Sequence, residues 1–170
     1  MTAAPALISD PGVFSLFQAV TAPFGDGYVV AWDAFESEIT VKAFNGDGSV
    51  AAAEFTVGAA ADDQLTPQLT PAVASLASAE PTFVVAWWQA SGNGDPPEIR
   101  AQRFTTNGAT NATPLGSEVT VNTSSGFPQS GPQIAALSEG AFVVVWIASK
   151  NDAEAADIYF QRFDQNGVKV

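Results

Sequence analysis

The chain has 170 residues, of which 46% are hydrophobic and 14% are charged, and it contains neither Cys nor His. Six Lys and Arg stand against 18 Asp and Glu, and the resulting net charge of −12 repels nucleic acid phosphates and anionic lipid headgroups. The absence of thiols and imidazoles excludes Ser-His-Asp triads and ordinary zinc or copper sites. No apolar run approaches the ~20 residues of a membrane helix. We therefore expect neither nucleic-acid binding nor membrane insertion.

Three imperfect copies of one repeat follow each other along the chain, and each copy predicts short β strands. The first copy, approximately 10–65, has strand-like segments at 18–20, 28–32, 39–44 and 54–57. The second, approximately 66–125, repeats them at 71–76, 83–87, 99–104 and 118–121. The third, approximately 126–170, has them at 132–137, 142–146 and 158–163. All are short, rich in Val, Ile, Phe and Trp, and bounded by Gly, Pro, Asn and Asp, which is typical of strands.

The second and third segments of each copy carry the clearest repetition. The second reads YVVAW at 28–32, FVVAW at 83–87 and FVVVW at 142–146. The third ends each time in Phe and is followed by an Asn-Gly pair, at 45–46, 107–108 and 166–167. Asn-Gly supplies the positive φ of a tight hairpin turn, so each copy is expected to form an antiparallel sheet of four strands.

The Trp-bearing strand indicates how these sheets pack. In the second copy Phe83, Val85 and Trp87 point to one face of the strand, and Val84, Ala86 and Trp88 point to the other. A strand that is apolar on both faces must be covered on both faces, as in radially stacked propeller blades. The predicted fold is therefore all-β, with three four-stranded antiparallel units in a β-propeller-like array, and with Trp32, Trp87 and Trp146 in its core.

Three blades are fewer than a propeller usually has, and this predicts self-association. The third copy shows no fourth strand after Phe163, so the edge of its last strand, with Ile158 and Phe160, is expected to be open. Residues 1–9 hold a strand-like piece, with Ala6, Leu7 and Ile8 at its centre. We expect this piece to be exchanged onto the open edge of another molecule, so that oligomerisation completes the three blades.

The repeat resembles a family of repeats in large secreted bacterial proteins, many of them adhesin-like and associated with repeats-in-toxin segments. The residues that carry the resemblance are Phe142–Trp146, Ile158–Asp164 and Asn166-Gly167, together with Glu118–Asn122 and Pro132–Leu137. The first copy diverges most, since Lys42-Ala43 replaces the Gln-Arg pair of the other two. The resemblance implies a propeller-like fold and an extracellular or cell-surface location, although no signal peptide is visible. It implies no enzyme.

The loops between the second and third strands of each copy carry the candidate site residues. Hard carboxylate oxygens suit Ca²⁺, and in the first copy they come from Asp33, Glu36 and Glu38, although solvated acidic loops explain the same residues and no other cofactor is expected. Candidate contacts to a protein or glycan partner are the following: Trp88, Asp95, Glu98, Asp152 and Asp157. Arg103 and Arg162 occupy equivalent positions, and we expect each to pair with an acid such as Glu118 or Asp164 at a sheet edge.

No pair of carboxylates stands out from the repeat pattern, so the sequence predicts a protein that is not an enzyme. The expected function is a non-catalytic secreted or surface module that presents a loop-rich face to a partner or glycan. Two alternatives remain open at this point: a self-assembling structural protein that forms a ring or filament, and a calcium-dependent adhesin domain.

Overall fold

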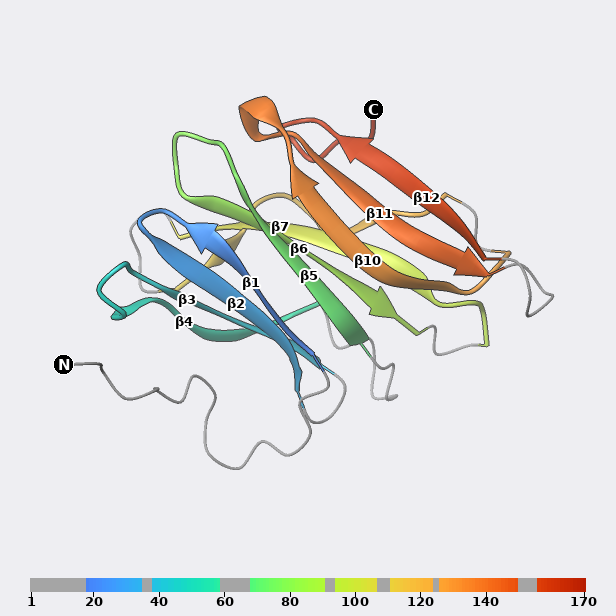
Figure 1. Cartoon of the computed structure of the whole chain (residues 1–170), viewed down its shortest axis with the longest axis horizontal. Coiled ribbons are helices and arrows are strands. Elements are labelled where there is room, and N and C mark those ends of the chain that lie inside the picture. Colours follow the sequence, from blue (N-terminus) through green and yellow to red (C-terminus); the bar gives the residue numbers. More distant parts are fainter. Residues whose placement is uncertain are drawn as a thin grey trace.

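The computed structural model describes residues 18–34, 38–58, 68–90, 94–106, 111–123, 126–149 and 156–170, which form three antiparallel β sheets side by side (Figure 1). Sheet A contains β1 (Ala19–Phe24), β2 (Gly27–Ala34), β3 (Glu38–Phe44) and β4 (Val50–Val57). Sheet B contains β5 (Gln68–Leu76), β6 (Thr82–Gln89), β7 (Glu98–Thr105), β8 (Thr113–Pro114) and β9 (Val119–Thr120). Sheet C contains β10 (Gln129–Ala136), β11 (Phe142–Ser149) and β12 (Ala156–Phe163).

The prediction of an all-β fold built from antiparallel sheets is confirmed. In sheets A and C the strands pair in chain order, as in a meander. In sheet B the strands β5 to β8 also do so, and β9 pairs with β7 as well. The one helical element described is a single 3₁₀ turn, Ser138–Gly140, between β10 and β11. No helix in the described part of the chain is long and apolar enough to cross a membrane.

Among the first strands of the three sheets, β5 lies between β1 and β10 and contacts both (Figure 1). Each sheet also has a front face, defined here as the face that carries the Trp of its second strand, and a back face opposite. The front of sheet B packs on the back of sheet A, and this core contains Phe83, Val85 and Trp87 with Val29 and Ala31. The same relation holds between the front of sheet C and the back of sheet B.

The three tryptophans predicted to be core are all buried, with exposed fractions of 3% for Trp32, 0% for Trp87 and 5% for Trp146. Beside them the second and third strands of each sheet contribute an aromatic pair to the front face. Phe83 stacks on Phe104 at 5.5 Å and Phe142 on Phe163 at 4.7 Å between ring centroids. Burial of these aromatic and branched side chains is the main force that holds the sheets together.

The last strand of sheet C differs from the sequence-based expectation of an edge open along its whole length. The chain turns at Asp164–Gly167, where Gly167 adopts a φ of 78°, and returns beside β12. Phe163 then pairs with Lys169, and the backbone N–H of Val170 donates to the carbonyl of Arg162 at 3.0 Å. The part of the edge at Arg162 and Phe163 is thus occupied, because the turn brings the following residues back alongside it. The predicted exchanged strand at Ala6–Ile8 lies outside the described residues.

Candidate functional site

A buried carboxylate lies at the end of the sheets where β2, β6 and β11 finish and where β5 and β10 begin. We call this the loop-rich end, after the chain connections that leave and enter the strands there. Asp33 is near the end of β2 and only 1% exposed, the one buried Asp or Glu among the described residues. It alternates with Val29 and Ala31, so it lies on the back face of sheet A, towards sheet B. The equivalent residues of the other sheets are Trp88 and Ile147. Asp33 is therefore specific to the first sheet rather than a repeat feature.

The backbone holds the Asp33 carboxylate in place. The N–H of Gln18 donates to Asp33 Oδ1 at 2.7 Å, and the N–H of Asp33 donates to the carbonyl of Gln18 at 3.2 Å. These two bonds fix the end of β2 against the residue that precedes β1. An ionised carboxylate only accepts hydrogen bonds, and the donors that suit it include hydroxyl groups as well as backbone N–H groups.

A residue with a strained backbone, Thr70, lies near the start of β5, the first strand of the neighbouring sheet B. Thr70 of β5 adopts a φ of 52°, which is costly for a β-branched side chain. It sits in an irregularity of the pairing between Leu69 and Ala72, opposite Trp87. The equivalent residue of β10 is Gly131, with a φ of 59°, which a glycine adopts without strain. Strain of this kind concentrates at functional sites.

The Thr70 hydroxyl adds a second anomaly at this position. Its oxygen is buried and makes no hydrogen bond, which is rare for a buried polar atom. Asp33 lies near the end of β2 and Thr70 near the start of β5, which contacts β2, so both lie at the loop-rich end of adjacent sheets. A carboxylate and an unsatisfied hydroxyl are the groups that bind the hydroxyls of a polar ligand.

Two of the buried tryptophans are anchored by glutamines at this end. Trp146 Nε1 donates to Oε1 of the buried Gln129 at 2.6 Å, and Trp87 Nε1 donates to Oε1 of Gln89 at 3.2 Å. Since these indole N–H groups are satisfied within the protein, the tryptophans serve the core rather than a ligand.

The acidic residues predicted to bind a partner or Ca²⁺ do not form one cluster. Glu98 makes an ion pair of 2.8 Å with Arg100, which also bonds Glu118 at 3.4 Å. Asp95 and Asp157 are exposed, and Glu38 is half-buried. Over the described ranges no three acidic side chains come together as metal ligands. Glu36 and Asp152 lie outside those ranges.

Trp88 is the one aromatic residue among the predicted contacts to a partner or glycan. The structure places it half-buried, packed against the core between sheets B and C. Its side chain lies on the back face of sheet B, which sheet C covers. Val84 and Ala86 lie on the same face of β6 as Trp88, because alternate residues of a strand point to the same side, and this face is buried.

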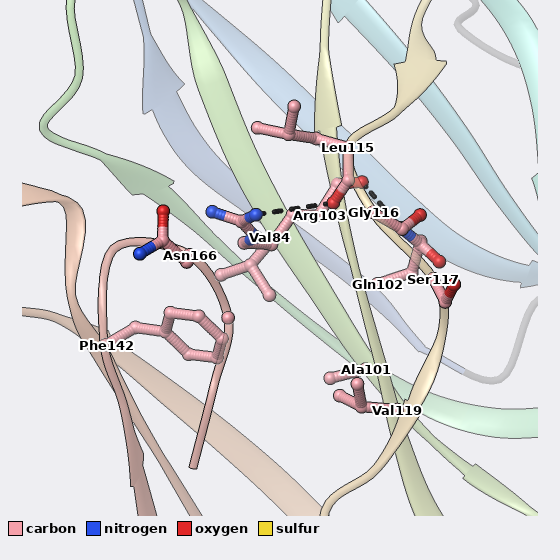
Figure 2. Close-up of a pocket in the computed structure, with 11 residues that line it drawn as sticks. Val84, Ala101, Gln102, Arg103, Leu115, Gly116, Ser117, Val119, Phe142 and Asn166 are labelled. Atoms are coloured by element: carbon pink, nitrogen blue, oxygen red, sulfur yellow. Dashed lines mark hydrogen bonds between the residues drawn. The ribbon is translucent and has the colours of Figure 1, made fainter. Parts of the chain in front are cut away.

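A small hollow between sheets B and C is built around Arg103 and has a volume of about 130 Å³. Figure 2 shows Phe142 and Asn166 of sheet C on one side, and Val84, Ala101 and Arg103 of sheet B on the other. The guanidinium donates to the carbonyl of Gln165, in the turn after β12, and to that of Leu115 at 3.4 Å. Burial lowers the pKa of Arg103, and the nearby Asp164 partly opposes this.

This arrangement revises the expected pairing of Arg103. Glu118 forms an ion pair with Arg100 instead, and the Arg103 guanidinium donates its hydrogen bonds to two backbone carbonyls. Arg103 therefore ties the turn of one sheet to the outer strands of the preceding sheet. The sequence indicated that Arg103 and Arg162 are equivalent, but not that their partners would be main-chain atoms of a different repeat.

No family model and no curated protein matches the sequence. Two solved structures share its fold. Over 99% of this chain the GH43 endo-arabinanase from Bacillus licheniformis superposes with a TM-score of 0.55 and 14% identity. The endo-arabinase from Bacteroides thetaiotaomicron VPI-5482 superposes on 96% of this chain with a TM-score of 0.52 and 11% identity. The chain spans 64% of the length of each. Both are five-bladed propeller enzymes, and the likeness shows a β-propeller-like fold.

The comparison corrects the predicted function. Both structural neighbours are glycoside hydrolases, so the expectations of a protein that is not an enzyme, of a non-catalytic binding module, and of a purely structural or adhesive role are not supported. The prediction of no enzyme rested on the lack of a carboxylate pair that stands out from the repeat pattern. Glycoside hydrolysis needs only two carboxyl groups, and the repeat pattern does not single out two of the 18 Asp and Glu of the chain.

Proposed function

We propose that the three sheets are consecutive blades of a propeller that acts on a polysaccharide of the arabinan class, with Asp33 as one of its two reacting carboxyl groups. The observation that carries this proposal is the superposition of nearly the whole chain on two endo-arabinanases. An extracellular location, which the repeat resemblance implies, suits such a substrate.

The chemistry of the loop-rich end supports a sugar ligand. Glycoside hydrolysis uses one carboxylic acid to protonate the leaving oxygen and one carboxylate as base or nucleophile. Asp33, which accepts a backbone hydrogen bond and is sheltered from water, fits the second role. The free hydroxyl of Thr70 fits a sugar hydroxyl, which both donates and accepts.

The second carboxyl group is best sought at the same end of the sheets. Glu98 is a poor choice, because Arg100 pairs with its Oε2 and the hydroxyl of Thr120 donates to the same oxygen. Glu38, Asp95 and Asp157 lie on the same loop-rich end and are at least partly exposed, so they are the acids to vary.

The test is the release of reducing ends from linear arabinan by the purified chain and by the Asp33→Asn variant. Asparagine keeps the size of the side chain and an acceptor oxygen but removes the charge. We expect the variant to keep its melting temperature, to lose at least about a hundredfold in rate, and to retain arabinan binding in affinity electrophoresis. The matched control is Glu80→Gln, an exposed acid in the loop before β6 at the other end of the sheets. If the wild-type chain neither binds nor cleaves arabinan, the proposal is wrong.

A further inference from the structure

Because the three sheets repeat the same strand pattern, the exposure of a residue in one sheet can be compared with that of its equivalent in the next sheet. Ile158 and Phe160 of β12 correspond to Ile99 and Ala101 of β7. Ile99 and Ala101 are 0% and 1% exposed, because sheet C covers the back face of sheet B. Ile158 and Phe160 are 77% and 71% exposed. The back of sheet C thus presents side chains of a kind that is buried in the other sheets.

Neighbouring residues extend this surface. Ile147 of β11, which follows the half-buried Val143 and Val145 on the same face, is 41% exposed. Large apolar side chains grouped on one face of a soluble protein mark an interaction site. We call this set, Ile147, Ile158, Phe160 and Arg162, the back surface of sheet C.

Arg162 gives the back surface its polar feature. It is exposed, whereas its counterpart Arg103 donates to the carbonyl of Gln165 in the turn that follows the third strand of the next sheet. A sheet that covers the back surface of sheet C should therefore present to Arg162 a turn like the one at 164–167. This requirement indicates which partner can dock there.

Sheet A carries such a turn. The N–H of Gly48 donates to the carbonyl of Asn45 at 2.9 Å, as Gly167 does to Asp164 at 3.0 Å. A second hydrogen bond closes each turn. The N–H of Asn45 donates to the carbonyl of Ser49 at 2.8 Å, and the N–H of Asp164 donates to the carbonyl of Val168 at 2.9 Å. By this alignment Gly46 stands where Gln165 stands, and the acidic Asp47 lies one residue further on. The turn therefore offers both a carbonyl and a negative charge to an arginine.

The front face of sheet A is also incompletely covered. Tyr28 stacks on Phe44 at 5.0 Å, as Phe83 and Phe142 stack on their own partners. Tyr28 is nevertheless 37% exposed, whereas Phe83 and Phe142 are 0% and 1% exposed. Val50, the cross-strand partner of Phe44, is 48% exposed. Val30, Trp32 and Phe44 form a small cluster on the same face and are 8%, 3% and 8% exposed, so the open part of this face is the end that carries Tyr28 and Val50.

We propose that the back surface of sheet C docks the front face of sheet A from a second copy of this chain, with Arg162 reaching the turn at 45–48. The contact pairs a back face with a front face, as sheets A and B and sheets B and C already do, but on sheet A it uses the open end that carries Tyr28 and Val50. It is head-to-tail, since each copy uses one surface as donor and a different one as acceptor. It does not depend on the proposed hydrolase activity.

Two variants test the back surface of sheet C and the front face of sheet A independently. Ile158→Ser with Phe160→Ser removes the back surface, and Tyr28→Ser removes part of the front face of sheet A. All three residues are at least one-third exposed, so the fold is expected to survive, which circular dichroism and thermal melting check. The matched control is Tyr159→Ser, a change in the same strand but on the opposite face, where Tyr159 stacks on Trp146.

Sedimentation velocity over a concentration series gives the readout. We expect the wild type and the Tyr159 variant to associate with rising concentration, and each surface variant to weaken association about tenfold or more. Arg162→Ala should weaken it as well. A mixture of the two surface variants should form a one-to-one complex, because each copy retains the surface that the other lacks. A wild type that stays monomeric, or surface variants that associate like the wild type, would overturn the proposal. Failure of the mixed pair to form a complex would also count against it.

Discussion

Arg103 of β7 donates a hydrogen bond to the backbone carbonyl of Gln165, 62 residues further along the chain and in the next sheet. The bond fastens the turn after β12 to the outer part of sheet B, beside the Asp164 carboxylate. It adds a directional contact beside the apolar core between sheets B and C. Its removal has a measurable consequence.

Replacing Arg103 by Met should lower the free energy of unfolding by about 1–2 kcal/mol, because two carbonyls lose a charged donor while the aliphatic stem is largely retained. Urea denaturation followed by tryptophan fluorescence measures this loss. Arg162→Met, at the equivalent exposed position, is the control and should change the stability of the dilute monomer by less than about 0.5 kcal/mol. Equal losses in the two variants would contradict the inter-sheet role.

Replacing Gln129 by Leu should cost about 1–3 kcal/mol, because the buried Nε1–H of Trp146 loses its acceptor and no water replaces it. Gln89→Leu is the matched control, since Gln89 is only half-buried and its bond to Trp87 is longer, at 3.2 Å. Thermal and urea unfolding should rank the Gln129 variant clearly below the Gln89 variant. The reverse order would show that burial of the glutamine does not decide the cost.

Replacing Gly27 by Ala should destabilise the chain by about 2–3 kcal/mol, because the added Cβ would lie 2.0 Å from the carbonyl oxygen of Phe44 and the backbone would have to move. Gly25→Ala, in the same hairpin turn, is the comparison. Gly25 has a φ of 58° and open space around it, so only the backbone strain of about 1 kcal/mol is expected. Calorimetric melting of both variants checks this order.

Acid should weaken the turns at 45–48 and 164–167. The pKa of Asp164 lies below its ordinary value of 3.8, chiefly because the N–H of Val168 donates to its carboxylate. The pKa of Asp47 is lowered first by the hydroxyl of Ser49 and then by its N–H. A depressed folded-state pKa adds stability above pH 3.8, and this stability is lost as the pH falls through the lower folded value.

The double variant Asp47→Asn with Asp164→Asn should therefore show a flatter dependence of melting temperature on pH in this acidic window. The wild type should be the more stable protein above it, with the difference shrinking towards low pH. Melting curves recorded along a pH series measure the effect. Parallel curves for the two proteins would refute the contribution of these carboxylates.

The all-β class, the antiparallel pairing and the buried tryptophans follow from the sequence alone, because they depend on local patterns. Alternating apolar residues around Trp87 require cover on both faces of one strand, and turn residues such as Asn166-Gly167 reverse the chain. A pattern of this kind repeats in every copy and so becomes visible without any knowledge of contacts between copies.

Features that depend on how one sheet meets the next came only from the tertiary structure. Sequence indicated that Asp33 is acidic, but not that it is buried against sheet B, since the repeat places Trp88 and Ile147 at the same position. It likewise did not reveal the strain at Thr70, whose counterpart is the permissive Gly131, or the carbonyl partners of Arg103. Burial, strain and hydrogen-bond partners are set by atoms distant in the chain. A repeat pattern therefore determines the unit, and only the packing of units decides which of its variable residues form a site.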